Sequence, residues 1–475
     1  MDKLNYINGQ WTGNELNRMD VVNPANNQVV GTVPVAGVNE TRQAIEAAHS
    51  AFKPWSALTV YERADYLEQF YQLMQEQKEE IGLILTKEMG KPLAEAIGEV
   101  DYAASFIKWF LEEGKREYGR TIPSHQAHKR MLVTKQPVGV VGAITPWNFP
   151  AAMITRKIGP ALISGCTVIV KPSKQTPLTA IKLIELLEQT GIPAGVVNLL
   201  TGGSREIAGE LLSNAKVKKI TFTGSTEVGK VLIRQSAENV KKLSLELGGH
   251  APIIVFDDAD IDRAVKETLA SKFRNGGQTC ICGNRIYVQD GIYETFVTKF
   301  AEAVKQLQVG DGLAKGTNIG PIIDEAGFKK VDSHVKNAIE LGAECVIGGK
   351  GEIRDGGHFY YPTVLSNVSS DMLIMNEETF GPVAPVQKFS TDEEVIELAN
   401  ETTPYGLAAY VFTENYKRGL KTVEALDYGI VGWNDGTPSA AQAPFGGMKE
   451  SGLGREGGIE GLEEFLETKY VSIGL

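Results

Sequence analysis

The chain has 475 residues, which is too long for one ordinary hydrophobic core and indicates two or three domains. Its 48 basic and 59 acidic side chains give a formal charge of −11 without a basic face, so nucleic acid is not an expected partner. Four cysteines cannot form a disulfide framework, and neither a signal peptide nor a membrane span is apparent. We therefore expect a cytoplasmic protein with no membrane partner.

The N-terminal part is predicted to contain short strands and then helices. Asn8-Gly9 has the composition of a hairpin turn, and residues 29–33 have the β-prone character of a strand. Helical patterns follow at residues 39–78, 81–89 and 92–117. Because helical spacing alone explains the aromatic residues of these segments, we attribute them to a core and not to a binding stripe.

The middle part alternates short β-prone runs with helical segments. Strands are expected at residues 167–170, 196–200, 219–222 and 242–246. Helices are expected at residues 177–189, 205–212 and 228–235. This alternation is typical of a parallel sheet covered on both faces, whose ligands bind beyond the carboxyl ends of the strands. A second α/β block begins near residue 251, and the chain ends in a β-prone tail from Glu467.

One segment of the second block combines flexible, reactive and charged residues. It reads Phe-Arg-Asn-Gly-Gly-Gln-Thr-Cys-Ile-Cys-Gly-Asn-Arg over residues 273–285. Glycines let a backbone approach a ligand closely, and positive charge near a cysteine increases its thiolate fraction. The segment indicates Cys280 as a catalytic nucleophile. The alternative is a loop with two buried, inert cysteines, which is the commoner role of a free cysteine.

Three strand ends have residues suited to nucleotide binding or acid–base chemistry. Residues 223–229 open a helix whose N–H groups could face a pyrophosphate, although a plain tight turn explains the glycine spacing equally well. Lys171 and Lys174 could hold a nucleotide ribose or its phosphate, or could lie on a solvated surface. Glu246, placed between two leucines, is a candidate general base with a raised pKa, against the default of a surface carboxylate.

Two other patterns are not expected to have a function. Residues 452–457 match the letters of a dinucleotide-binding fingerprint, but no predicted strand precedes them and no βαβ unit follows. The six histidines lack the spacing of metal ligands, and two cysteines separated by one residue do not make a zinc site. No metal is therefore expected.

Five motifs together resemble a known family. They are Ile-Thr-Pro-Trp-Asn-Phe-Pro at residues 144–150, Phe-Thr-Gly-Ser-Thr-x-Val-Gly at 222–229, Leu-Glu-Leu-Gly-Gly at 245–249, Gly-Gln-Thr-Cys at 277–280 and Glu-Glu-x-Phe-Gly-Pro at 377–382. With these motifs in this order, the chain closely resembles the aldehyde dehydrogenase superfamily from residue 7 to its C-terminal tail. Residues 151–157, residues 272–275 and the Cys280-x-Cys282 pair most resemble succinate-semialdehyde dehydrogenases.

The resemblance implies an α/β fold of the aldehyde dehydrogenase type: a Rossmann-type cofactor domain, an α/β catalytic domain and a small β oligomerisation flap. We expect the NAD(P)-binding domain at residues 1–115 and 136–247, the catalytic domain at 248–455, and the bridging β segment at 116–135 and 456–475. An unpaired terminal strand is a liability unless another chain or domain covers it. We therefore expect the tail to complete a sheet in a partner subunit of a homodimer or homotetramer.

The resemblance also implies a covalent reaction. Cys280 attacks the aldehyde to give a thiohemiacetal, whose oxyanion is held by the side-chain amide of Asn148 and the N–H of Cys280. Loss of hydride to the nicotinamide leaves a thioester, and Glu246 activates the water that hydrolyses it to a carboxylate. Cys282 is expected to be a redox partner that could form a disulfide with Cys280, although so short a loop strains the bond.

The same resemblance gives the cofactor contacts. The expected cofactor-binding residues are Thr145, Trp147, Lys171, Ser173, Lys174, Gly224, Ser225, Glu378 and Phe380. Among them, Lys171 and Lys174 would meet the adenosine ribose, and Glu378 would bind the nicotinamide ribose. NAD-preferring relatives often have Glu at the position of Lys174. A lysine there favours the 2′-phosphate of NADP, with use of NAD also possible.

Three residues fall where semialdehyde dehydrogenases bind the distal carboxylate: Arg156, Arg274 and Ser439. Arginines beside a tunnel are costly unless an anion meets them, so succinic semialdehyde is the expected substrate, although Arg274 could instead pair with an acid. The alternatives are another small aldehyde (glutarate semialdehyde, glycolaldehyde or an amino-aldehyde) and a non-catalytic, crystallin-like member of the family. A CoA-acylating variant is disfavoured because Glu246 is present to activate water.

Overall fold

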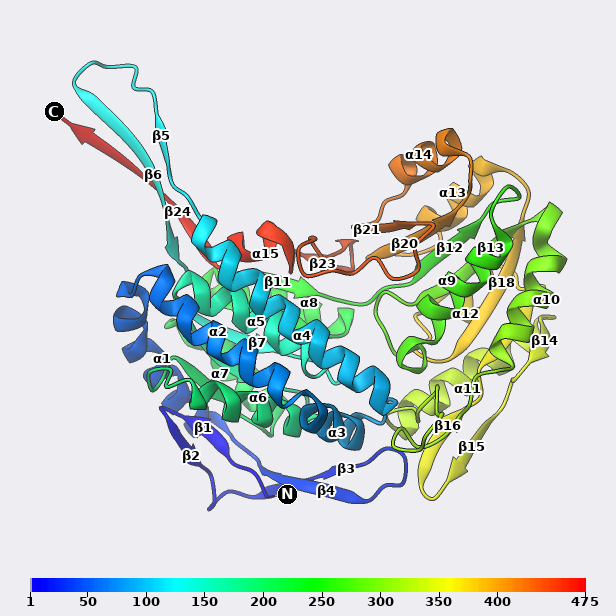
Figure 1. The fold of residues 1–475 in the computed structure, drawn as a ribbon, viewed down its shortest axis with the longest axis horizontal. Coiled ribbons are helices and arrows are strands. Elements are labelled where there is room, and N and C mark those ends of the chain that lie inside the picture. The colour runs from blue at the N-terminus through cyan, green and yellow to red at the C-terminus, as the bar shows by residue number, and fades with distance from the viewer. Residues whose placement is uncertain (1) are drawn as a thin grey trace.

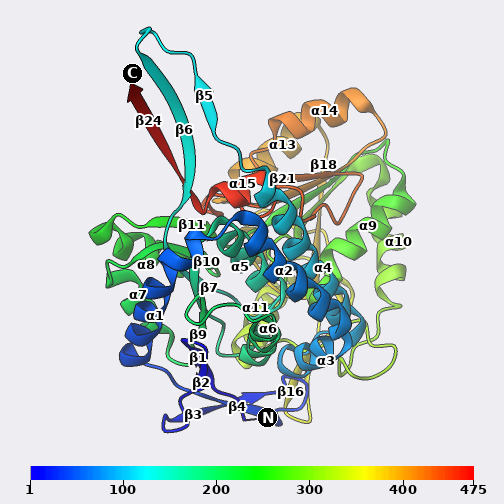
Figure 2. The same ribbon diagram turned by 60° about the vertical axis from the view of Figure 1, so that its left-hand side comes forward.

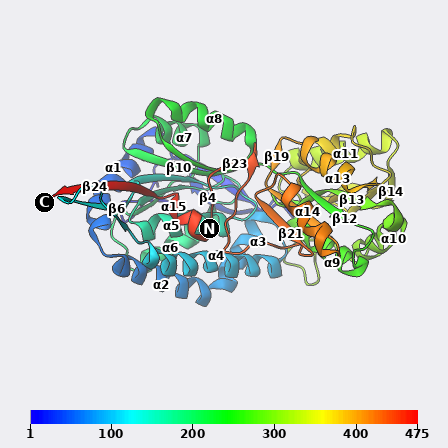
Figure 3. The same cartoon turned by 90° about the horizontal axis from the view of Figure 1, so that it is seen from above.

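The computed structural model describes residues 2–475 and has two α/β bodies and a projecting β arm (Figure 1). The first body is built on an eight-stranded sheet and the second on a seven-stranded sheet. Seen from above, the two bodies lie side by side, and the arm extends away from the first (Figure 3). The expected α/β class, with two large units and a small β segment, is confirmed.

The first sheet has the strand order β2-β1-β9-β8-β7-β10-β11-β23. Its strands are β1 (Asn5–Ile7), β2 (Gln10–Thr12), β7 (Val140–Ile144), β8 (Thr167–Lys171), β9 (Val197–Leu199), β10 (Val217–Thr223), β11 (Lys242–Glu246) and β23 (Gly452–Leu453). Neighbours from β9 to β11 are parallel, whereas the edge strands are antiparallel. Every residue of β7 and β8 is buried, as expected for apolar runs in a parallel sheet covered on both faces.

Helices cover both faces of this sheet. They are α1 (Val38–Ala57), α2 (Val60–Glu76), α3 (Lys78–Met89), α4 (Leu93–Glu113), α5 (Ala152–Ser164), α6 (Pro177–Gln189), α7 (Ser204–Ser213), α8 (Thr226–Ser236) and α15 (Gly458–Glu463). Val168 and Val170 of β8 join the core formed with α2 to α6, and Ile169 joins the core formed with α1, α7 and α8. The period of two along a strand therefore builds two apolar layers.

The second sheet has the order β14-β17-β18-β13-β12-β20-β21, and only β14 is antiparallel to its neighbour. Its strands are β12 (Ala251–Val255), β13 (Gly283–Gln289), β14 (Glu344–Ile347), β17 (Thr363–Ser366), β18 (Val383–Phe389), β20 (Ala408–Phe412) and β21 (Ile430–Trp433). Its helices are α9 (Ile261–Phe273), α10 (Tyr293–Val304), α11 (Glu325–Glu340), α12 (Leu373–Asn376), α13 (Asp392–Glu401) and α14 (Tyr416–Ala425). Ile253 packs in the core of α9 and α10, and Ile254 in that of α11 and α13.

The arm is a three-stranded sheet that stands clear of both bodies (Figures 1 and 2). It contains β5 (Arg120–Ile122), β6 (Lys129–Pro137) and β24 (Leu466–Gly474) in the order β24-β6-β5. The C-terminal tail thus pairs with β6 of its own chain, from Leu466 opposite Pro137 to Gly474 opposite Lys129. The outer edge of β24 has no neighbouring strand among residues 2–475.

Three two-stranded sheets complete the described chain. They pair β3 (Arg18–Val22) with β4 (Val29–Pro34), β15 (Gly351–Arg354) with β16 (Gly357–Tyr360), and β19 (Tyr405–Gly406) with β22 (Met448–Lys449). Within residues 2–475, no helix combines the length and apolar character needed to cross a bilayer.

Two of the expected helical segments differ most from the observed helices. The pattern at residues 39–78 divides into α1 and α2, because Thr59 starts a new helix by accepting a hydrogen bond from the N–H of Glu62 while the Glu62 carboxylate accepts one from the N–H of Thr59. This reciprocal capping is a local signal that apolar spacing does not reveal. The helix expected at residues 92–117 ends at Glu113 and continues as the short 3-10 turn η1 (Gly114–Arg116).

Candidate active site

A cavity of about 220 Å³ lies where the turns after β7, β10 and β11 meet the segment that precedes β13. It is lined by Pro146, Trp147, Asn148, Met153, Thr223, Gly224, Ser225, Leu247, Gly248, Cys280, Glu378 and Phe380. The structure therefore brings residues from all five sequence motifs to one space between the bodies. We call this space the central cavity.

Cys280 reaches the central cavity through a turn that requires glycine. Asn275, Gly276 and Gly277 have φ angles of 53°, 61° and 74°, in the left-handed region that disfavours residues with side chains. A Cβ atom on Gly277 would lie 2.2 Å from the carbonyl oxygen of Gly381. Glycine at this position thus lets the turn, η3 (Arg274–Gly277), pack directly against the loop before β18.

Burial controls the ionisation of Cys280. It raises the pKa of the thiol to about 12, and the positive charge of Arg156 opposes this rise without cancelling it. Positive charge near Cys280 therefore favours its thiolate, but burial has the larger effect on the pKa of the thiol. Arg285, five residues after Cys280, is buried and donates hydrogen bonds to the carbonyl oxygens of His250 and Ala399.

Asn148 is buried beside the cysteine turn. Its side-chain Nδ2 donates a hydrogen bond to the carbonyl oxygen of Gln278 at 3.1 Å, two residues before Cys280. Its own carbonyl oxygen accepts hydrogen bonds from Lys91 Nζ at 2.8 Å and Asn275 Nδ2 at 3.0 Å. The amide donor and the thiol therefore lie on two adjoining, mutually bonded turns.

Glu246 ends β11 with 2% of its surface exposed. Burial raises the pKa of its carboxyl well above the ordinary range, the nearby Glu456 raises it further, and Arg156 and Lys157 oppose the rise. Among residues 2–475, its Oε2 atom has no hydrogen-bond partner. A buried carboxyl with a free oxygen and a raised pKa has the properties of a general base, as its apolar flanks predict.

The turn between β10 and α8 has features that suit a dinucleotide. Gly224 follows β10, and a Cβ atom there would lie 2.4 Å from the Phe222 ring, so the turn has room only for glycine. Ser225 then caps α8 by accepting a hydrogen bond from the N–H of Val228. A glycine turn at a helix N-terminus suits a pyrophosphate. Thr145, next to this region, has a buried hydroxyl without a hydrogen-bond partner in the described chain.

Lys171 is the last residue of β8, and Ser173 and Lys174 follow it. Lys171 Nζ donates to Ser204 Oγ at 2.6 Å, and burial, with a smaller contribution from Lys174, lowers the pKa of Lys171 to about 8. Lys174 is exposed, and Ser173 Oγ faces the side chain of Gln175. One buried and one exposed ammonium group offer complementary contacts to ribose hydroxyls and to a phosphate.

The far wall of the central cavity supplies the remaining predicted cofactor contacts. Glu378 accepts a hydrogen bond from the N–H of Gly249 at 3.1 Å, and burial raises the pKa of its carboxyl to about 7. The Phe380 ring lies edge-on to Trp147, with 5.5 Å between centroids and an interplanar angle of 82°. These two rings and the Glu378 carboxyl therefore face the cavity that Cys280 also lines.

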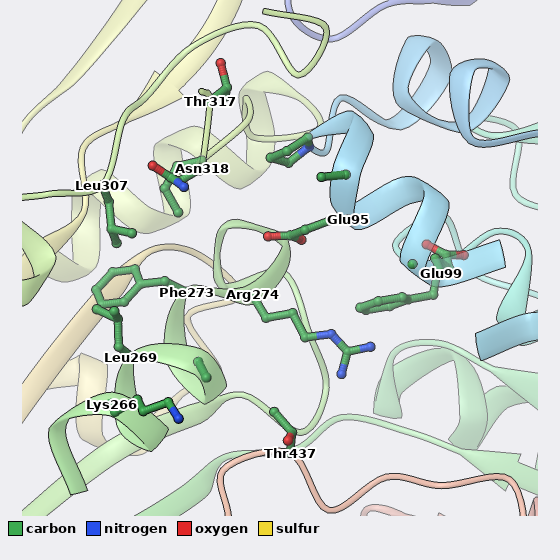
Figure 4. A pocket seen from close by; sticks show the side chains of 16 residues that line it. Glu95, Glu99, Lys266, Leu269, Phe273, Arg274, Leu307, Thr317, Asn318 and Thr437 are labelled. Carbon is green, nitrogen blue, oxygen red and sulfur yellow. The ribbon is translucent and has the colours of Figure 1, made fainter. Parts of the chain in front are cut away.

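A second cavity, of about 630 Å³, lies on the other side of the cysteine turn and is called the outer pocket here. Arg274 extends into it between Glu95 and Thr437 (Figure 4). Its guanidinium lies 4.9 Å from the ring centroid of Phe149 and has no ion-pair partner within 4 Å among residues 2–475. The Glu95 carboxyl lines the same pocket; burial raises the pKa of that carboxyl, and the charge of Arg274 helps to oppose this rise. Arg274 therefore interacts with this acid at longer range than an ion pair.

Arg156 differs from Arg274 because it has an acidic partner. Its Nη2 lies 2.9 Å from an Oε2 of Glu456, in poor alignment for a hydrogen bond, and its guanidinium stacks on Phe445 at 3.9 Å. Ser439, the third predicted substrate contact, shares a 2.5 Å hydrogen bond with the Tyr102 hydroxyl. Only Arg274 of the two arginines therefore presents an unpaired charge.

Cys282 is buried and does not line the central cavity. Its thiol donates a hydrogen bond to the carbonyl oxygen of Lys272 at 3.3 Å. Its role as a redox partner of Cys280 stays a prediction.

Sequence reasoning missed the charged residues behind the site. Glu456 forms ion pairs with Arg156 and Lys157, and Lys91 forms a buried ion pair with Glu99. Glu456 lies in the glycine-rich stretch at residues 452–457, where the fingerprint letters drew attention to the glycines. Glu456 stands between Arg455 and Gly457, so it lacks the apolar flanks that distinguish Glu246 in the sequence.

Comparison with known proteins identifies the family to which these features correspond. The sequence model of the aldehyde dehydrogenase family matches residues 11–471. The chain is 55% identical to the succinate-semialdehyde dehydrogenase (NADP+) GabD of Escherichia coli (strain K12), covering 99% of this chain and 97% of that protein. It is 52% identical to a glutarate-semialdehyde dehydrogenase of Pseudomonas putida, covering 98% and 97%. The crystal structure of an E. coli NADP dependent enzyme superimposes with a TM-score of 0.98 at 54% identity, covering 100% of this chain and 98% of that one.

The raised pKa of Cys280 predicts how its reactivity depends on pH. Below the pKa, the thiolate fraction rises roughly tenfold per pH unit, so alkylation of Cys280 by iodoacetamide should accelerate steadily from pH 7 to pH 9. Peptide mapping by mass spectrometry follows Cys280 separately from the exposed Cys345. A rate that levels off below pH 8 would show that the thiol is already ionised at neutral pH.

Proposed function

The chain belongs to the aldehyde dehydrogenase family, and we propose that it oxidises succinic semialdehyde to succinate with NADP as the favoured cofactor. One observation carries this proposal. Cys280 and Asn148 line a cavity shared with the cofactor motifs, while the unpaired guanidinium of Arg274 occupies the outer pocket beyond the same turn. A reactive carbon at Cys280 and an anion at Arg274 are the two ends of a short ω-carboxy aldehyde.

The first step joins the substrate to Cys280. The thiol gives its proton to solvent, and its sulfur attacks the aldehyde carbon to form a thiohemiacetal. Asn148 Nδ2 and the N–H of Cys280 donate hydrogen bonds to the oxyanion that forms. Asn148 Nδ2 already donates a hydrogen bond of 3.1 Å to the carbonyl oxygen of Gln278. The oxyanion competes with this neutral acceptor and binds the amide more strongly because it is charged.

The second step removes hydride and then the acyl group. NAD(P)+, when bound, supplies the hydride acceptor. Trp147 and Phe380 fit the role of confining the reacting centre, and Glu378 that of a ribose ligand. Collapse of the oxyanion with loss of hydride leaves a thioester on Cys280. Glu246 then takes a proton from water, which attacks the thioester carbon and releases the carboxylate and the Cys280 thiol.

Arg274 supports an anionic substrate over the other small aldehydes. A partly buried guanidinium without an acidic partner is costly, and a carboxylate relieves that cost with charge-assisted hydrogen bonds. An amino-aldehyde would meet repulsion at this point, and glycolaldehyde would leave the charge unpaired. Glutarate semialdehyde, one methylene longer, is the second candidate, because the relative at 52% identity has that name and the outer pocket measures about 630 Å³. The complete set of Cys280, Glu246 and Asn148 disfavours a non-catalytic, crystallin-like role.

Two lysines support NADP over NAD. Lys171 ends β8 and Lys174 lies three residues further on, where no carboxylate is present to accept hydrogen bonds from the ribose hydroxyls. An ammonium group at an exposed position attracts a 2′-phosphate without paying for burial. NAD remains usable, because Lys171 can contact a ribose without its phosphate.

We also propose a homodimer or homotetramer and a cytoplasmic location. The arm exposes 54% of Tyr470 and 40% of Ile473, and β24 has an open edge that a second copy of the chain could cover. All four cysteines are free, which suits a reducing compartment. Sedimentation equilibrium measures the size of the assembly directly.

Replacing Arg274 by alanine tests the substrate. KM for succinic semialdehyde should rise about tenfold to hundredfold, because a charge-assisted pair with the carboxylate is lost, whereas KM for propanal should stay near its wild-type value. Steady-state rates with both aldehydes give the comparison. Lys266→Ala is the matched control, since it removes an exposed positive charge from the rim of the same pocket and should change neither KM appreciably. Equal effects of Arg274→Ala on both aldehydes would contradict the proposal.

Replacing Lys174 by glutamate tests the cofactor. The wild type should show the higher kcat/KM with NADP, and Lys174→Glu should lower that value about tenfold to hundredfold by placing a carboxylate against the 2′-phosphate. The value with NAD should be unchanged or higher, because glutamate can accept hydrogen bonds from the ribose hydroxyls. A clear wild-type preference for NAD would overturn the assignment.

A further inference from the structure

We propose that Lys91 and Glu99 are positioning residues that hold the Asn148 amide in place to receive the oxyanion. The inference rests on the proposed function, because it assigns Asn148 the role of oxyanion donor. Neither side chain lines the central cavity, so both would act through Asn148 and not on the substrate carbon. Glu99 also lines the outer pocket, and propanal, which has no distal carboxylate, separates the two positions (Figure 4).

The pair is sealed from solvent. Lys91 Nζ and Glu99 Oε2 are 2.5 Å apart, and each side chain has 1% of its surface exposed. Taking two charges out of water costs free energy that their mutual attraction often fails to offset, so a buried ion pair is weak evidence for stability by itself. Its remaining hydrogen bonds therefore indicate what the pair does.

Lys91 fixes the main chain at Asn148. Its Nζ donates a second hydrogen bond, of 2.8 Å, to the Asn148 carbonyl oxygen, which also accepts one from Asn275 Nδ2. The ammonium group in addition lies 3.8 Å from the ring centroid of Phe149, the next residue. Two donors on one carbonyl set the plane of that peptide and so the direction in which the Asn148 side chain leaves the backbone.

Glu99 fixes the same turn from its other end. Its Oε1 accepts hydrogen bonds from the N–H groups of Ala151 at 2.9 Å and Ala152 at 3.3 Å. These residues start α5, where no side chain of the helix itself provides a cap. The turn that contains Asn148 is thus held at its carbonyl by Lys91 and at the following helix N-terminus by Glu99.

A double variant separates the effect of the buried charges on stability from the effect of the Lys91 hydrogen bond on Asn148. Lys91→Met leaves the Glu99 carboxylate buried without a partner and should lower the melting temperature strongly. In Lys91→Met/Glu99→Gln, the pair is neutral, and the glutamine oxygen can still accept from Ala151 and Ala152. The double variant should therefore melt close to the wild type while lacking the bond from residue 91 to the Asn148 carbonyl and the contact of the ammonium group with the Phe149 ring.

The expected kinetic result is a loss in kcat without a matching change in KM. For both succinic semialdehyde and propanal, kcat of the double variant should fall about tenfold to hundredfold, the cost of a misplaced oxyanion donor. In an Asn148→Ala background, the same two substitutions should change kcat by less than about twofold, because there is no amide left to place. The control Lys182→Met/Glu80→Gln neutralises a 2.9 Å ion pair between α6 and α3 and should leave kcat unchanged.

Three outcomes would overturn the proposal. They are a wild-type kcat in the well-folded double variant, an equal further loss in the Asn148→Ala background, and an effect confined to KM. Propanal distinguishes a failure of this proposal from a failure of the substrate assignment. It has no distal carboxylate, but its oxidation still needs the oxyanion donor. If the wild type oxidises propanal and not succinic semialdehyde, the substrate proposal fails and the kinetic test of Lys91 still stands.

Discussion

Charge buried where the two bodies meet is the constraint on which the site depends. Arg156, Lys157, Glu246 and Glu456 each have at most 4% of their surface exposed. Removing one partner from such a cluster typically costs about 3–5 kcal/mol, because the charge left behind is uncompensated. The cluster is tolerated because Glu456 faces both cations and because the raised pKa of Glu246 allows that carboxyl to be neutral. The same burial strengthens every electrostatic interaction with the reacting atoms, because the local dielectric constant is low.

Arg156 and Arg274, which the family resemblance assigns to the same substrate contact, have different surroundings in the structure. Arg156 is paired with Glu456, stacked on Phe445 and close enough to Cys280 to lower the pKa of its thiol. Arg274 is unpaired and extends into the outer pocket. Arg156 therefore makes ionisation of Cys280 less costly, and Arg274 is the residue that we propose for the anionic end of a substrate. The distinction is invisible in the sequence, where both are arginines near a motif.

The fold could be predicted largely from local patterns. The run at residues 167–170 is apolar throughout because β8 is covered on both faces, and Glu246 stands out because it ends a strand between leucines. Long-range pairings could not be predicted. Lys157 and Glu456 are separated by 299 positions and Lys91 and Asn148 by 57, and no local pattern encodes such contacts. For the same reason, the sequence shows positive charge near Cys280 but does not show that burial has the larger effect on the pKa of its thiol.

The central claim is that Cys280 forms the covalent intermediate and Glu246 directs water to it. The most direct measurement is mass spectrometry of the Cys280 peptide from Glu246→Gln, quenched after mixing with NADP+ and succinic semialdehyde. The account predicts one succinyl group on Cys280, accumulating together with a single turnover of NADPH, because formation of the thioester proceeds and its hydrolysis does not. NADPH formed without an adduct, or an adduct on another residue, would contradict it.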